Sequence, residues 1–138
     1  MATPRKLDFN EKPYIVIWET TQACDLACVH CRACAQPQRN PFELSTPEAK
    51  GLIDQIAEMK VPVFVLTGGD PLKRSDIHEL VEYAQHRGVH TSMTPSATPL
   101  LAKGAIARFK EGGLARLAVV VCHGLRGGCL GGGGWVCR

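Results

Sequence analysis

The sequence has no block of like charges and no long apolar run. Its 138 residues carry a formal net charge of +3, and the scattered basic residues form no tract of the kind that binds nucleic acid or an anionic membrane. No apolar run approaches the roughly 18 residues needed to span a bilayer. Residues 1–12 are polar and lack the apolar h-region of a secretory signal peptide. We therefore expect a cytoplasmic protein with neither nucleic-acid nor membrane partners.

Aromatic residues are also few, at 6%, but hydrophobic residues make up 45% of the chain and charged residues 21%. This balance is typical of one soluble globular domain. Seven cysteines could indicate a secreted disulfide scaffold, but such scaffolds are small and rich in turns. The long strand and helix patterns of this chain favour a reducing compartment, with cysteines used as ligands.

Three of the cysteines stand at the spacing C-x3-C-x2-C, directly after the apolar stretch 14–18; they are Cys24, Cys28 and Cys31. Three thiolates can hold three irons of a cubane [4Fe–4S] cluster, which leaves the fourth iron open to a ligand that is not protein. Two alternatives stay open from the cysteines alone. C-x2-C is also the usual half of a zinc site, and Cys34 extends the spacing toward a ferredoxin run, although the final Cys-Pro of that run is missing.

A second motif follows the apolar stretch 61–67, where the chain reads Gly68-Gly69-Asp70-Pro71. Two adjacent glycines let a backbone approach a ligand closely, and a carboxylate or carbonyl oxygen can accept a hydrogen bond from an ammonium group. Taken alone, Gly-Gly-Asp is more often a structural turn. Its position one strand and one helix after the cysteines favours a shared site.

The rest of the pattern alternates between strand and helix. Strands are expected at 14–19, 61–67, 89–94 and 114–121, and helices at 47–59, 76–87 and 99–111. The helix caps are expected at Ser45 or Thr46, at Ser75 and at Thr98. Buried faces are expected to hold Leu52, Ile53, Ile56, Ala57, Met59, Ile77, Leu80, Val81, Ala84, Leu100, Leu101, Ile106 and Phe109. This alternation predicts a parallel sheet with right-handed crossovers.

The cysteines, the Gly-Gly-Asp turn and Thr94-Pro95-Ser96 each follow the end of an expected strand. In parallel α/β folds, binding residues collect at the carboxyl edge of the sheet. The sequence therefore predicts one cofactor site at this edge. By contrast, His78, His86 and His90 lie in or beside the second helix and are expected to be solvated.

The segments 18–35, 66–74 and 94–100 resemble the first half of the core of the radical S-adenosylmethionine (radical SAM) enzymes, of the SPASM group. The resemblance implies a TIM-type partial barrel, of which this chain would supply three βα units and a fourth strand. It implies that Cys24, Cys28 and Cys31 hold a [4Fe–4S] cluster. Cys34 is expected to be a packed or free thiol, since a fourth thiolate would block the open iron. The implied contacts to SAM are Gly68, Gly69, Asp70, His30, Thr94 and Ser96, with Asp70 standing where the family usually has Glu.

The resemblance also implies an activity. A reduced cluster would cleave SAM to methionine and a 5′-deoxyadenosyl radical, which would abstract a hydrogen atom from a substrate. An external one-electron donor of the flavodoxin or ferredoxin type would be needed. The SPASM group includes enzymes that modify peptides and enzymes of haem and quinone-cofactor biosynthesis, so the implied substrate is a peptide or a tetrapyrrole.

The resemblance ends after Ala118, and residues 124–138 hold seven of the 14 glycines. We expect an N-terminal arm at 1–12, a truncated radical SAM core at 13–121 and an irregular Gly- and Cys-rich tail at 122–138. The tail is either a flexible or metal-binding extension or the product of a frameshift, and the frameshift is favoured because the change falls inside a strand. Two further readings stay open: a catalytically inactive fragment that binds iron–sulfur, and a zinc-binding structural module.

Overall fold

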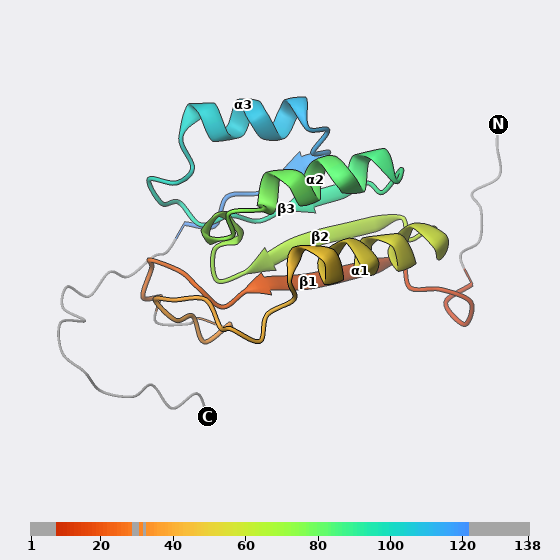
Figure 1. The fold of residues 1–138 in the computed structure, drawn as a ribbon, viewed down its shortest axis with the longest axis horizontal. Coiled ribbons are helices and arrows are strands. Elements are labelled where there is room, and N and C mark those ends of the chain that lie inside the picture. Colours follow the sequence, from red (N-terminus) through yellow and green to blue (C-terminus); the bar gives the residue numbers. More distant parts are fainter. Residues whose placement is uncertain (1–7, 29–30, 32, 122–138) are drawn as a thin grey trace.

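The computed structural model describes residues 8–28, 31 and 33–121 (Figure 1). Strands and helices alternate along this part of the chain. Their bounds are β1 (Ile15–Thr21), α1 (Thr46–Glu58), β2 (Val63–Gly68), the short 3-10 helix η1 (Pro71–Lys73), α2 (Ile77–His86), β3 (Thr91–Met93), α3 (Lys103–Glu111) and β4 (Arg116–Leu117). All neighbouring strands pair in parallel, in the order β1-β2-β3-β4. The α/β fold with a parallel sheet, predicted as part of a barrel, is confirmed.

The arrowheads of β1 and β2 point to the same side of the molecule in Figure 1. The loop that carries the cysteines leaves β1 at that side, and the Gly-Gly-Asp turn leaves β2 beside it. The two strands stay in register from Ile15 opposite Val63 to Glu19 opposite Thr67, where an irregularity precedes the last pair, Thr21 and Gly68. The carboxyl edge predicted for the site is therefore formed.

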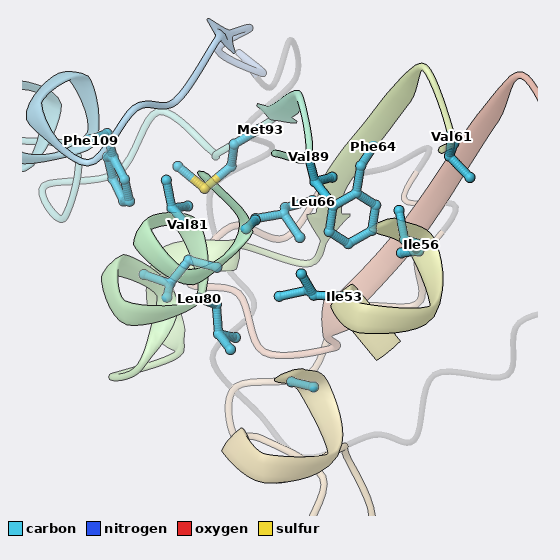
Figure 2. Close-up of a cluster of buried hydrophobic side chains, with 13 residues drawn as sticks. Ile53, Ile56, Val61, Phe64, Leu66, Leu80, Val81, Val89, Met93 and Phe109 are labelled. Atoms are coloured by element: carbon cyan, nitrogen blue, oxygen red, sulfur yellow. The ribbon is translucent and has the colours of Figure 1, made fainter. Parts of the chain in front are cut away.

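Helices cover one face of the sheet and bury an apolar core against it (Figure 2). Phe64 and Leu66 of β2 point into this core, and Val65 between them points to the opposite face because side chains alternate along a strand. On that opposite face Ile15 and Ile17 of β1 are 46% and 56% exposed. The core residues are Ala49, Ile53, Ile56, Val61, Phe64, Leu66, Ile77, Leu80, Val81, Ala84, Val89, Met93 and Phe109.

Helix α1 begins as its sequence predicts. Ser45 is the N-cap residue and forms a capping box with Glu48, whose carboxylate accepts from the Ser45 backbone N–H. The same carboxylate also accepts from the Ser45 hydroxyl. Ile53 and Ile56 are buried as expected, but Met59 is exposed. The helix ends at Glu58, so Met59 is the C-cap residue and lies off the buried stripe.

Two other predicted caps are wrong. Helix α2 begins at Ile77, with Asp76 rather than Ser75 as its N-cap residue, and the Asp76 side chain makes no capping hydrogen bond. Helix α3 begins only at Lys103, after Ala102, and not at Pro99. The Thr98 hydroxyl cannot cap it, because that hydroxyl donates to the carboxylate of Asp70. For Thr98, a tertiary contact thus takes the side chain that the local pattern assigns to a cap.

The last part of the sheet is shorter than predicted. Strand β4 covers two residues instead of 114–121, and Val119, Val120 and Val121 are exposed. Within the described ranges β4 has a neighbour on one side only. Leu100 and Ile106 are 43% and 41% exposed, contrary to prediction, and Phe109 is the only α3 residue in the core. The predicted tail at 122–138 lies outside the described residues.

Candidate cofactor site at the carboxyl edge

The Gly-Gly-Asp turn lies directly against the start of the cysteine loop. The backbone N–H of Gly69 donates to the Thr21 carbonyl (2.7 Å), and the N–H of Asp70 donates to the Ala23 carbonyl (2.7 Å). A Cβ atom added at Gly68, which has φ +135°, would lie 2.3 Å from the carbonyl oxygen of Thr21. One added at Gly69 would lie 2.5 Å from the carbonyl oxygen of Ala23. No side chain fits either position without displacing backbone. The close approach predicted for these glycines thus occurs against the chain's own cysteine loop.

Asp70 is fully buried, with 0% of its surface exposed. Its Oδ1 accepts from the backbone N–H of Leu72 (3.1 Å) and more weakly from that of Ser96 (3.4 Å), and its Oδ2 accepts from the Thr98 hydroxyl (2.9 Å). The carboxylate therefore ties the turn after β2 to the turn after β3. Burial of a charge is tolerated only with such partners.

Ser96 joins three segments at one point. Its hydroxyl donates to the Gly69 carbonyl (3.2 Å) and lies 3.5 Å from the Cys24 sulfur. Beside it, the Thr94 hydroxyl donates to the Thr67 hydroxyl (2.7 Å). The structure thus brings the first predicted cluster ligand together with the segments predicted to contact SAM.

The three candidate ligand cysteines lie along one loop, and Cys24 and Cys31 are free thiols. Cys24 is buried, and its Sγ accepts from the Leu26 backbone N–H (3.3 Å); Sγ of Cys31 accepts from the N–H of Ala35 (3.4 Å). The N–H of Cys31 donates to the Cys28 carbonyl (3.2 Å). Hydrogen bonds from backbone N–H groups to sulfur stabilise thiolate ligands and tune iron–sulfur clusters. By its chemistry, this set of donors therefore suits such a cluster.

The side chains of the candidate ligands are not gathered around a common point. Within 8–28, 31 and 33–121, no three His, Cys, Asp or Glu side chains form a set that could hold a metal ion. His30, predicted to contact SAM, lies outside the described residues. Cys34 is disulfide-bonded, so the prediction of a packed or free thiol is wrong at this position.

Comparison with known proteins agrees with this geometry. The sequence profile of the radical SAM superfamily matches residues 18–124. The chain is 39% identical over 122 residues to the AdoMet-dependent heme synthase of Oleidesulfovibrio alaskensis. The aligned residues make up 88% of this chain and 31% of that synthase. It is 42% identical over 99 residues to the mycofactocin maturase MftC of Mycolicibacterium smegmatis, covering 67% of this chain and 25% of the maturase. The chain belongs to the radical SAM superfamily.

Members of this superfamily are enzymes that use a [4Fe–4S] cluster and SAM. A third relative, the Fe-coproporphyrin III synthase of Methanosarcina barkeri, is 38% identical over 110 residues, which are 80% of this chain and 27% of the synthase. The chain thus spans about a third or less of the length of the curated relatives it matches. In the described part of this radical SAM chain, no helix has the length and apolar character needed to cross a membrane.

The sequence patterns give no indication of Glu43, whose carboxylate connects the two ends of the cysteine loop in this radical SAM chain. Glu43 accepts from the Thr21 hydroxyl (2.9 Å), the Gln22 backbone N–H (2.9 Å) and Arg39 Nε (2.8 Å). Burial by itself raises the pKa of Glu43, but the hydrogen bonds from Arg39 and Gln22 outweigh it and lower the pKa overall. The carboxylate therefore joins the beginning of the loop to its end. No local sequence pattern signals this contact, which spans 22 residues.

The prediction for His78 is also wrong. Its ring stacks on Phe109 of α3, with centroids 4.0 Å apart, and its Nδ1 is buried without a hydrogen-bond partner. Burial, followed by the charge of Arg108, lowers the pKa of His78 below its ordinary value. This histidine is a packing residue between two helices and not a solvated one.

Proposed function

We propose that this chain forms the cluster- and SAM-binding part of a radical SAM enzyme. The observation that carries the proposal is the meeting of Cys24, Ser96 and Gly69. The Ser96 hydroxyl lies 3.5 Å from the Cys24 sulfur and donates to the Gly69 carbonyl. A cluster ligand and both segments proposed to contact SAM are thereby adjacent, as a shared cofactor site requires.

In this proposal Cys24, Cys28 and Cys31 hold a [4Fe–4S] cluster, and the iron without a cysteine binds SAM. Sulfur is the ligand that iron–sulfur clusters prefer, and two of the three sulfurs already accept backbone hydrogen bonds. When bound, the reduced cluster and SAM supply one-electron chemistry that produces an adenosyl radical from SAM. The chain's own part is to hold and orient both groups.

The proposed SAM contacts are Gly68, Gly69, Asp70, His30, Thr94 and Ser96. The Asp70 carboxylate is engaged by Leu72, Ser96 and Thr98. We therefore assign the ammonium group of SAM to backbone carbonyl oxygens of the turn, with the carboxylate fixing their position. A carbonyl oxygen accepts a hydrogen bond from an ammonium group without burying a second charge.

The substrate proposal rests on the relatives. They are named as a heme synthase, a coproporphyrin synthase and a peptide maturase. We propose a tetrapyrrole or a peptide as substrate and a flavodoxin or ferredoxin as electron donor. The chain covers about a third of the heme synthase.

The test is low-temperature EPR of the chain after anaerobic reconstitution with iron and sulfide and reduction by dithionite. We expect a [4Fe–4S]⁺ signal that changes when SAM is added. Cys24→Ser should abolish the signal, and Cys34→Ser, which opens a disulfide but removes none of the three proposed ligands, should keep it. Zinc in place of the cluster, or equal loss in both variants, would contradict the proposed ligand set.

A second candidate is a fragment that binds a cluster but performs no catalysis. It is favoured by the share of its relatives that the chain covers, 25% to 31%. The same experiment separates the two candidates. A cluster signal that is indifferent to SAM supports the inactive fragment, because SAM binding would then need strands beyond those described.

A further inference from the structure

Arg74 is the largest fully buried side chain among the described residues, with 1% of its surface exposed. It follows η1, four residues after Asp70. Its Nε and Nη2 donate to the two oxygens of Asp76, at 2.9 Å and 2.7 Å. The guanidinium carbon lies 5.4 Å from the centre of the Trp18 ring, within the range of a cation–π interaction.

The remaining contacts of Arg74 go to the two ends of the cysteine loop. Its Nη1 donates to the carbonyl oxygen of Thr20 (3.2 Å) and to that of Leu44 (3.0 Å). Thr20 precedes the loop at the end of β1, and Leu44 follows it just before α1. One nitrogen therefore holds together two backbone positions that flank all three candidate ligand cysteines.

The position of the guanidinium is itself fixed. Asp76 accepts from the Thr46 hydroxyl (2.7 Å) as well as from Arg74. Burial by itself raises the pKa of Asp76, but the hydrogen bonds from Arg74 and Thr46 outweigh it and lower the pKa overall. A bidentate pair with a carboxylate sets the plane of the guanidinium, so its Nη1 has one direction. That direction is toward the base of the loop.

We propose that Arg74 is a positioning residue for the iron–sulfur cluster. It fixes the separation of the loop's two ends and so the geometry in which the cysteines bind iron, without touching the cluster itself. Residues that orient metal ligands from outside the ligand set commonly change metal affinity by 10- to 100-fold when they are replaced. This inference rests on the proposed function, since it assumes that the loop binds a cluster.

Arg74→Lys is the main test. Lysine keeps the positive charge beside Asp76, so the pair is not left with an unpartnered buried carboxylate, but one ammonium cannot make the bidentate contact and reach both carbonyls. Asp76→Asn is the second variant, since it leaves Arg74 in place and weakens only its orientation. Phe109→Leu in α3 is the matched control, because Phe109 is buried and contacts neither end of the loop.

Two measurements are made at urea concentrations that give all variants the same free energy of unfolding. The first is the rate at which the reconstituted cluster is lost to a chelator, followed by its visible absorbance. The second, on the chain without iron, is the alkylation rate of buried Cys24 relative to half-buried Cys31, read by mass spectrometry. This ratio reports local opening of the loop. We expect Arg74→Lys to raise both by about tenfold, Asp76→Asn to raise them less, and Phe109→Leu to leave them unchanged.

The outcomes separate this inference from the proposed function. A cluster that forms in the unsubstituted chain, but is lost equally slowly from Arg74→Lys and the control, would overturn the inference alone. A chain that takes up no cluster would overturn the proposed function and the inference with it. A rise in both measurements confined to the Arg74 and Asp76 variants supports both.

Discussion

The two ends of the sheet are held together by different means. At the β1–β2 end, pairing runs from Ile15 opposite Val63 through to Thr21 opposite Gly68, and buried polar side chains tie the following loops to one another. At the β3–β4 end, the strands pair only at Ser92 with Arg116 and Met93 with Leu117, followed by one isolated parallel bridge between Ser96 and Val120. Helix α3 is attached there mainly through one buried ring, that of Phe109.

This difference shows where the chain needs a defined geometry. Asp70, Arg74 and Glu43 each satisfy several donors or acceptors at the edge that carries the cysteines. A fully satisfied polar network fixes positions more narrowly than apolar packing does. The β4 end has exposed valines at 119–121, and within the described ranges β4 pairs on one side only. We infer that the cysteine edge is built to hold a site.

The strongest way to break this comparison is Asp70→Ala, because Asp70 links the two ends. Removing the Asp70 carboxylate leaves the backbone N–H groups of Leu72 and Ser96 and the hydroxyl of Thr98 without this acceptor. We expect the free energy of unfolding to fall by about 3 kcal/mol. Asp70→Asn, which keeps one oxygen acceptor, should cost roughly 1 to 2 kcal/mol. Urea unfolding followed by circular dichroism measures both.

Asp25→Ala is the control for Asp70. It removes a carboxylate whose side chain is 50% exposed and which pairs with Lys73 at 2.7 Å. An exposed pair of this kind contributes less than about 1 kcal/mol. Equal losses of stability in Asp70→Ala and Asp25→Ala would contradict the role given to the buried carboxylate.

The next largest effect is expected from Gly69→Ala. The added Cβ would lie 2.5 Å from the Ala23 carbonyl oxygen, so the cysteine loop or the turn has to move. We expect a loss of about 2 kcal/mol, together with faster alkylation of Cys24. Gly51→Ala in α1 is the matched control, with no atom within 4 Å of its Cβ. It should stabilise the chain by roughly 0.5 to 1 kcal/mol, because alanine favours the helix. Thermal and urea unfolding of the pair test the opposite signs, and a loss in both would show that the close approach at Gly69 is not the cause.

The elements predicted well from the sequence are those with local causes. The capping box of Ser45 and Glu48 fixes the start of α1, and the spacing of Ile77, Leu80, Val81 and Ala84 marks the buried face of α2. The edge where the site residues meet was also predictable, because parallel strands bring their carboxyl ends to one side.

The elements predicted poorly depend on contacts between distant parts of the chain. Thr98 reads as a helix cap, but its hydroxyl bonds to Asp70, 28 residues earlier. No sequence pattern singles out Arg74, which is buried because Asp76, Thr20 and Leu44 surround it with acceptors. Periodicity carries no information about such partners, and so the positioning residues of the site were missed.

The smallest predicted effect concerns the contact that attaches α3. His78 of α2 stacks on Phe109, and its pKa is lowered by burial and by Arg108, with Glu82 acting in the opposite direction. The folded state therefore binds a proton less readily than the unfolded state. The stability that this contact provides is complete above the ordinary histidine pKa of about 6.5 and is lost as the pH falls through the lowered value. We expect the Tm to decrease slightly more between pH 7.5 and pH 5.5 in the unsubstituted chain than in His78→Phe, which keeps the ring and cannot titrate. An identical pH dependence in the two chains would show that protonation of His78 does not loosen α3, and the weaker attachment of the β4 end would then rest on its short pairing alone.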